Sequence, residues 1–97
     1  MPTYIVLGNF TDQGIRNVKD TTKRVEAVRA TGKKLGVTVK EAYWTLGAYD
    51  VATIVEAPDE AAVTAFGLSI GALGNVRTQT LRAFTADEIG KVIAKMG

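Results

Sequence analysis

A tyrosine and an aspartate, Tyr49-Asp50, form the clearest chemical pair in this sequence, and they follow Gly47 closely. Gly47 can adopt a positive φ and turn the chain tightly, which would present both side chains at the end of a connection. A phenol beside a carboxylate can contact a substrate or transfer a proton. The structural alternative is that Asp50 accepts hydrogen bonds from turn amides while Tyr49 packs. We favour this turn role, with the Tyr49 hydroxyl at a pocket edge as a secondary role, because aspartate and glycine are common turn formers.

Two arginines, Arg16 and Arg24, are the next candidates, since a guanidinium can bind a carboxylate ligand. Their spacing of eight residues would place them near one face of a helix. Either could instead pair with Asp20 or Glu26, and such exposed pairing is the commoner outcome.

Two adjacent aromatic residues, Tyr43 and Trp44, lie in a segment that reads as a strand and must therefore point to opposite faces. The one that faces the interior of a barrel could line an apolar pocket with Phe10 or Tyr4. An aromatic core or a subunit interface is the more common role for such side chains.

The sequence holds 0 cysteines and 0 histidines, which excludes thiolate nucleophiles, Ser-His triads and histidine-ligated haem. Metal ligands are limited to oxygen donors such as Glu41, Asp50 and Glu56, which show no spacing typical of a metal site. We therefore expect no metal and no cofactor. No apolar run approaches about 18 residues and no basic segment opens the chain, so we expect a cytoplasmic protein without a membrane partner.

Four segments are predicted to be strands, because they are rich in β-branched and aromatic residues. They are residues 3–10, 37–46, 50–57 and 75–84. Apolar residues at helical spacing predict one long helix from Asp12 to about Leu35 and a second from Pro58 to about Gly74. Thr85 and Glu88 form a capping box that opens a short closing helix.

The order of these elements is βαββαβ with an additional C-terminal helix, in a single domain over residues 1–97. This order is typical of an α+β ferredoxin-like fold with a four-stranded antiparallel sheet. Right-handed crossovers place the first and third strands at the centre of the sheet.

The central strands are apolar on both faces, whereas the helices can cover only one. In the first strand, Tyr4 and Val6 point one way, and Ile5 and Leu7 point the other way. A large exposed apolar patch is unusual on a monomer. We therefore expect a second subunit to pack sheet to sheet in a dimeric α/β barrel. The alternative is that the closing helix covers its own sheet through Ile89, Val92, Ile93 and Met96.

Several segments together resemble the GYD domain family of small bacterial and archaeal proteins. The family is named for Gly-x-Tyr-Asp, which here is Gly47-Ala48-Tyr49-Asp50. The other matching segments are Phe10 to Asn17, Arg24, Glu56 to Asp59, Gly74 to Thr78 and Leu81 to Thr85. The resemblance implies a ferredoxin-like domain that forms oligomers, and it implies no particular activity.

Residues 12–36 contain seven basic and three acidic residues, a net charge of +4 against +2 for the whole chain. A basic helix can face nucleic acid, but acidic residues interrupt this one and no aromatic platform accompanies it. We therefore rank nucleic-acid binding last and expect no such partner.

Two other functions rank above nucleic-acid binding. The first is an oligomeric small-ligand-binding or regulatory protein, with the ligand between the sheet and the helices or at the dimer seam. The alternative is a cofactor-independent enzyme of the dimeric α/β barrel type, monooxygenase- or isomerase-like, that uses Tyr49, Asp50, Arg24 and one aromatic residue of the second strand. Convergence of Tyr49, Asp50 and Arg24 on one cavity would favour the enzyme.

Overall fold

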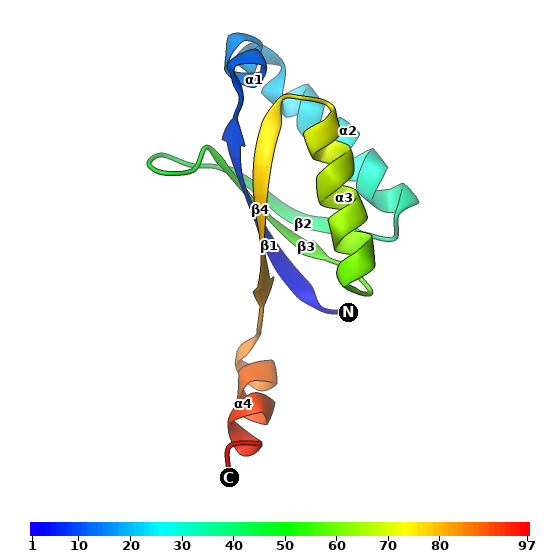
Figure 1. The fold of residues 1–97 in the computed structure, drawn as a ribbon, viewed down its shortest axis with the longest axis vertical. Coiled ribbons are helices and arrows are strands. Elements are labelled where there is room, and N and C mark those ends of the chain that lie inside the picture. Colours follow the sequence, from blue (N-terminus) through cyan, green and yellow to red (C-terminus); the bar gives the residue numbers. More distant parts are fainter.

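Four antiparallel strands form one sheet in the computed structural model, which describes residues 1–97. The strands are β1 (Thr3–Phe10), β2 (Thr38–Trp44), β3 (Val51–Glu56) and β4 (Val76–Ala83). Their order in the sheet is β2-β3-β1-β4, so β1 and β3 are central, as predicted. With the helices between them, the strands form the predicted α+β ferredoxin-like fold (Figure 1).

Two long helices pack on one face of this sheet and leave the other face without a covering element (Figure 1). They are α2 (Thr21–Lys34) and α3 (Glu60–Ala72). The short α1 (Asp12–Arg16) lies at the end of β1, and α4 (Ala86–Ala94) projects from the end of β4. We call the uncovered side of the sheet the open face.

The core lies between the sheet and α2 and α3, and it is small. Its nine hydrophobic members are Tyr4, Val6, Val37, Val39, Val55, Ala57, Val63, Phe66 and Ile70. Only 12 of the 97 residues are buried. A domain of this size gains little stability from its core alone, so further burial against a second surface would stabilise it.

The single helix predicted from Asp12 to Leu35 is wrong, because the chain breaks it. The helix α1 ends at Arg16, a 3-10 turn occupies Val18–Asp20, and α2 begins at Thr21. The Asn17 side-chain amide donates to the carbonyl of Gln13 at 3.0 Å and closes the first segment. The break follows from a distant contact: Gly14 packs directly on the backbone of Asn75, which fixes α1 against the α3–β4 connection.

The start of α3 also differs slightly from the prediction that Pro58 opens it. The helix begins at Glu60, and Asp59 is its N-cap, whose carboxylate accepts from the Ala62 N–H at 2.8 Å. One face of α3 supplies Val63, Phe66 and Ile70 to the core.

A β-bulge interrupts the pairing of β2 with β3. Val39 pairs with Val55, but the next pair is Glu41 with Ile54, so Lys40 has no partner across the strands. The extra residue reverses the alternation of faces beyond it. Ala42 and Trp44 therefore face the helices, whereas Tyr43 faces the open side, opposite Ala52.

The exit of the chain into α4 is held by local polar contacts. The predicted capping box is confirmed, with Thr85 Oγ1 accepting from the Glu88 N–H and a Glu88 carboxylate oxygen accepting from the Thr85 N–H. That bond to the Thr85 backbone N–H lowers the pKa of Glu88, and the neighbouring Arg82 guanidinium lowers it further. Arg82 also donates to the carbonyl of Thr3 at 3.3 Å. These contacts direct α4 away from its own sheet (Figure 1).

We expect Gly14→Ala to destabilise the fold, because the added methyl carbon would lie 1.9 Å from the Asn75 carbonyl oxygen. Overpacking of this kind costs about 1–3 kcal/mol. Gly71→Ala is the matched control, since no atom lies within 4 Å of its added carbon. In a helix that change stabilises by up to about 1 kcal/mol. Urea unfolding of both variants measures the difference, and equal midpoints would contradict this account of the α1 contact.

Candidate functional site

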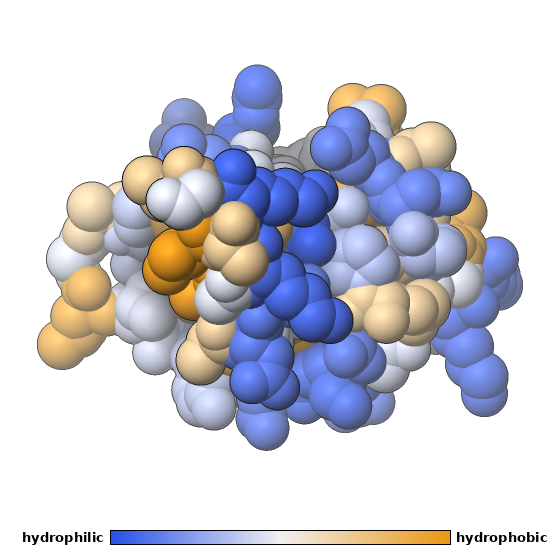
Figure 2. Space-filling view, turned by 90° about the horizontal axis from the view of Figure 1, so that it is seen from below, coloured by the Kyte–Doolittle hydropathy of each residue, from blue (hydrophilic) through white to orange (hydrophobic).

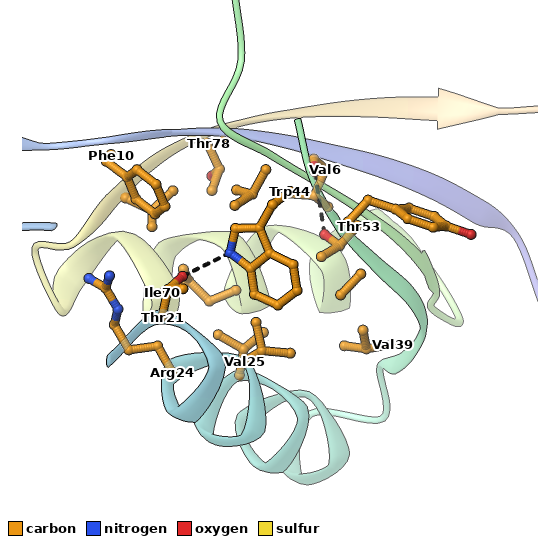
Figure 3. A pocket seen from close by; sticks show the side chains of 16 residues that line it. Val6, Phe10, Thr21, Arg24, Val25, Val39, Trp44, Thr53, Ile70 and Thr78 are labelled. Carbon is orange, nitrogen blue, oxygen red and sulfur yellow. Dashed lines mark hydrogen bonds between the residues drawn. The ribbon is translucent and has the colours of Figure 1, made fainter. Parts of the chain in front are cut away.

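An apolar pocket lies between the helix-facing side of the sheet and α2 (Figure 3). Its cavity volume is about 70 Å³. The apolar walls include Val6, Val25, Val28, Val39, Ile70 and Val76. None of its 16 lining residues is acidic, and Arg24 is the only charged one. The pocket is therefore suited to an apolar group that carries no positive charge.

Trp44 covers this pocket from the end of β2 (Figure 3). Its indole Nε1–H donates to the Thr21 hydroxyl on α2 at 2.9 Å, which ties the end of an edge strand to the helix. The residue stays 45% exposed, so the indole forms a wall with one side in solvent. The prediction that Tyr43 and Trp44 point to opposite faces is confirmed by the strand register.

Arg24 lies at the end of the pocket that also holds Phe10 (Figure 3). The guanidinium carbon is 5.5 Å from the centre of the Phe10 ring, within range of a cation–π contact. Its Nη2 donates to the carbonyls of Gly14 at 3.1 Å and Asn17 at 3.4 Å. The predicted pairing with Asp20 or Glu26 is not present. Arg24 instead joins α1 to α2 across the helix break.

The second guanidinium nitrogen of Arg24, Nη1, is buried and has no hydrogen-bond partner. No carboxylate lies within 4.0 Å of the side chain, since the two ion pairs of the chain are Lys40–Glu56 and Arg82–Glu88. A buried charged donor without a partner is costly. Arg24 thus holds both an unused donor and an uncompensated charge.

A smaller cavity of about 50 Å³ lies between α2 and α3. It shares four lining residues with the pocket, which are Arg24, Val28, Ile70 and Val76. The two apolar spaces are therefore neighbours, and Arg24 borders both.

The Gly47, Tyr49 and Asp50 segment forms the connection between β2 and β3 and ties together the end of the sheet. Gly47 has a φ of +103°, as its turn position required. The Asp50 carboxylate accepts from the Phe10 N–H of β1 at 2.9 Å, and the Asp50 N–H donates to the Gly8 carbonyl. We expected Asp50 to accept hydrogen bonds from amides of its own turn, and this expectation is wrong. The carboxylate instead accepts from an amide of β1 and extends the pairing of β3 with β1 by one hydrogen bond.

Tyr49 reaches further across the sheet. Its hydroxyl donates to the side-chain carbonyl oxygen of Gln79 on β4 at 2.8 Å. Gln79 lies opposite Leu7 on the open face, so Tyr49 bridges β1 on that face. Neither Tyr49 nor Asp50 lines the pocket that holds Arg24.

The three residues proposed for an enzyme therefore do not converge on one cavity. The sequence identified Arg24, Trp44 and Phe10 as candidates, and it left open whether a ligand would lie between the sheet and the helices or on the barrel side. The structure places the pocket on the helix side, and Tyr4 belongs to the core.

The sequence analysis did not identify Thr21 and Thr53 as pocket residues, because their only signal was a hydroxyl group among apolar residues. Thr53 donates to the carbonyl of Val6 at 3.3 Å.

The structure was also searched for a metal site and for a membrane-spanning helix. No group of three or more Asp or Glu side chains lies close enough together to hold a metal ion. None of the helices has the length and apolar character needed to cross a bilayer.

We expect Asp50→Asn to cost about 1 kcal/mol, because the amide oxygen can still accept from the Phe10 N–H and no arginine loses a partner. Asp50→Ala leaves that N–H without its acceptor and should cost about 1–3 kcal/mol. Tyr49→Phe removes one exposed hydrogen bond and should be almost silent. Thermal unfolding of the three variants gives the ranking. A loss from Asp50→Asn as large as from Asp50→Ala would indicate that the carboxylate charge matters more than the strand contact.

Comparison with known proteins places the chain among relatives that cover it nearly from end to end. It is 37% identical over 94 residues to the "glutamine synthetase and cystathionine beta-lyase binding protein" of Thermus thermophilus, a match over 95% of this chain and 99% of that protein. The crystal structure of TTHA0845, also from Thermus thermophilus, has 30% identity and a TM-score of 0.58, covering 89% of this chain and 96% of the other.

A more distant structure shares the fold alone. The crystal structure of MtbAldR superimposes with a TM-score of 0.68 at 15% identity, over 87% of this chain and 53% of that one. The family model of the GYD domain matches residues 4–93. With the Gly47, Tyr49 and Asp50 motif at the β2–β3 connection, this match shows that the chain belongs to the GYD domain family.

Proposed function

We propose that this protein is a homo-oligomeric binding protein with a regulatory role, in which copies pair through the open face of the sheet and each copy can hold a small molecule in its apolar pocket. The observation that carries the proposal is that the chain has two exposed apolar surfaces and no element of its own to cover either. One is the open face, and the other is one side of α4.

The open face has an apolar centre bordered by polar edges. The central side chains are Ile5 and Leu7 of β1 with Ala52 and Ile54 of β3, which lie opposite one another in the register. Tyr43 and Leu81 extend this patch onto the edge strands and remain 52% and 40% exposed. Contiguous apolar patches of this kind on a sheet are typical of protein–protein contacts.

The helix α4 supports pairing because it is amphipathic and does not pack on its own domain. Ile89, Val92, Ile93 and Met96 follow the spacing of one helical stripe, and all four are exposed. Figure 2, which views the molecule from the α4 end, shows hydrophobic side chains on one side of the nearest elements and hydrophilic ones on the other. The chain extends over 52 Å in its longest dimension. A second copy of the chain carries the complementary apolar face.

The alternative that α4 folds back over its own sheet is not realised, because the Arg82 and Glu88 contacts direct the helix outward. The geometry does not favour the enzyme alternative, since Tyr49 and Asp50 do not line the pocket that holds Arg24.

We expect light scattering at micromolar concentration to give at least twice the 10.3 kDa of one chain. Ile93→Glu places a carboxylate in the proposed contact and should weaken association at least about tenfold, because an unpaired charge is costly to bury. Leu81→Glu on the open face should act in the same direction. Leu68→Glu is the matched control, since Leu68 is 70% exposed on α3, outside both surfaces. A wild-type mass of one chain, or an unchanged mass in both Leu81→Glu and Ile93→Glu, would overturn the proposed assembly.

A protein partner is the second candidate, and the name of the Thermus thermophilus relative favours it. If this chain binds the same kinds of enzyme, purified glutamine synthetase or cystathionine β-lyase from its own organism should co-elute with it in size-exclusion chromatography. Elution of all three proteins at their separate volumes, at concentrations well above micromolar, would exclude these two partners.

A further inference from the structure

We infer that the free edge of β4 and the adjoining groove beside α3 bind an extended, acidic segment of a partner protein, which adds a fifth strand to the sheet. The inference deepens the proposal of a protein partner and rests on it, because it names the surface and the kind of segment that would meet there. The groove lies outside the apolar patch of the open face and outside α4. The site therefore does not depend on the proposed pairing of copies.

Only one side of β4 is paired. The order of the sheet places β4 at an edge, next to β1 alone. The Thr11 N–H donates to the Asn75 carbonyl at 3.0 Å, one position before the first pair of β1 with β4. Hydrogen-bonded and non-hydrogen-bonded pairs alternate along an antiparallel ladder, so the N–H and C=O groups of Thr78 and Thr80 point away from β1. The strand thus presents a free row of backbone donors and acceptors.

The opposite edge of the sheet is protected, whereas β4 is not. In β2, the bulge at Lys40 interrupts the row of backbone groups, and Arg29 donates to the carbonyl of Val39 at 2.8 Å. Bulges and charged side chains are common devices that prevent an edge strand from pairing with another chain. The eight residues of β4 include no proline and pair with β1 without a bulge. This edge is therefore the one that is open to strand addition.

A groove of about 550 Å³ lies between α3 and β4 and gives such a segment a second wall. Its lining includes Gly67 and Gly71 of α3 and Thr78 and Thr80 of β4. A methyl carbon added to Gly67 would lie 3.7 Å from the Thr78 hydroxyl oxygen, so the helix and the strand meet there. No atom lies within 4 Å of the same position on Gly71, which leaves that part of the wall open. An added strand would bond the β4 backbone and place alternate side chains in this groove.

The charge of the segment follows from the arginines of β4. Arg77 borders the groove and takes part in neither ion pair of the chain. None of the residues that line the groove is acidic. A second copy of β4 would bring Arg77 and Arg82 to this edge and no carboxylate, which makes a copy of the chain a poor occupant. Carboxylates on the segment of another protein would complement Arg77.

Two synthetic peptides test this chemistry. Acetyl-Val-Glu-Val-Thr-Val-Glu-Val-amide has strand alternation and two carboxylates, and acetyl-Val-Lys-Val-Thr-Val-Lys-Val-amide differs from it in the sign of its charge. In an NMR titration, the acidic peptide should cause saturable shifts and slow the hydrogen exchange of the outward Thr78 and Thr80 amides. Exchange of the Gln79 amide, which faces β1, should change little. The basic peptide should bind at least about tenfold more weakly, because its charge opposes that of Arg77.

Thr80→Pro removes the outward N–H of residue 80 and no bond to β1, and edge strands tolerate proline at such positions. It should weaken binding of the acidic peptide at least about tenfold, since the added strand loses a backbone donor. Thr80→Val is the matched control, because it keeps the branched shape and the N–H, and it should leave binding little changed. If Thr80→Pro does not fold, Leu68→Glu serves instead. It places a carboxylate beside the groove and should weaken binding of the acidic peptide by at least about tenfold.

Several results would overturn the inference. They are equal binding of the two peptides, equal losses in Thr80→Pro and Thr80→Val, unchanged exchange of the Thr78 and Thr80 amides, or no saturable response in the folded wild type. Protection of these amides in the free protein, with a lower mass for Thr80→Pro in light scattering, would show that a second copy occupies the edge and would overturn it as well. A partner enzyme that still co-elutes with Thr80→Pro would overturn this surface and leave the protein partner in place.

Discussion

The structure depends on one mismatch, which is that β1 and β3 carry apolar side chains on both faces of the sheet while the chain has helices for only one. The covered face buries Tyr4, Val6 and Val55 beneath α2 and α3. The other face leaves Ile5 and Ile54 half-buried with no element above them. Because the hydrophobic effect opposes this exposure, a surface that covers the open face would stabilise the domain.

Local contacts of the GYD motif act on the same central strand. Asp50 extends the pairing of β3 with the end of β1 through its carboxylate, and Tyr49 reaches β4 over the open face. The motif thus connects three strands at the end of the sheet where α1 begins. Asp50 and Tyr49 each have a hydrogen-bonding partner at that end of the sheet.

The strands, their order and the capping box of α4 could be predicted because their signals are local. The segment Thr3–Phe10 is β-branched and aromatic throughout, and Thr85 and Glu88 have capping-box spacing. The break before α2 could not be predicted, since it depends on Gly14 meeting the backbone of Asn75 far along the chain. The role of Arg24 was hidden for the same reason: its acceptors, the carbonyls of Gly14 and Asn17, lie on the far side of that break. The sequence left open whether the pocket lies between the sheet and the helices or at the dimer seam, because the bulge that turns Trp44 toward the helices gives no local signal.

The unpaired Lys40 in the bulge of β2 has a consequence for how this family can vary in length. With Lys40 present, the indole of Trp44 lies over the pocket and the phenol of Tyr43 faces outward. Loss of that one residue would join Val39 directly to Glu41, whose partners Val55 and Ile54 are already neighbours in β3. The pairing would then become regular, and both rings would keep their present faces. The bulge therefore lets β2 lose one residue without moving the wall of the pocket or the contact surface.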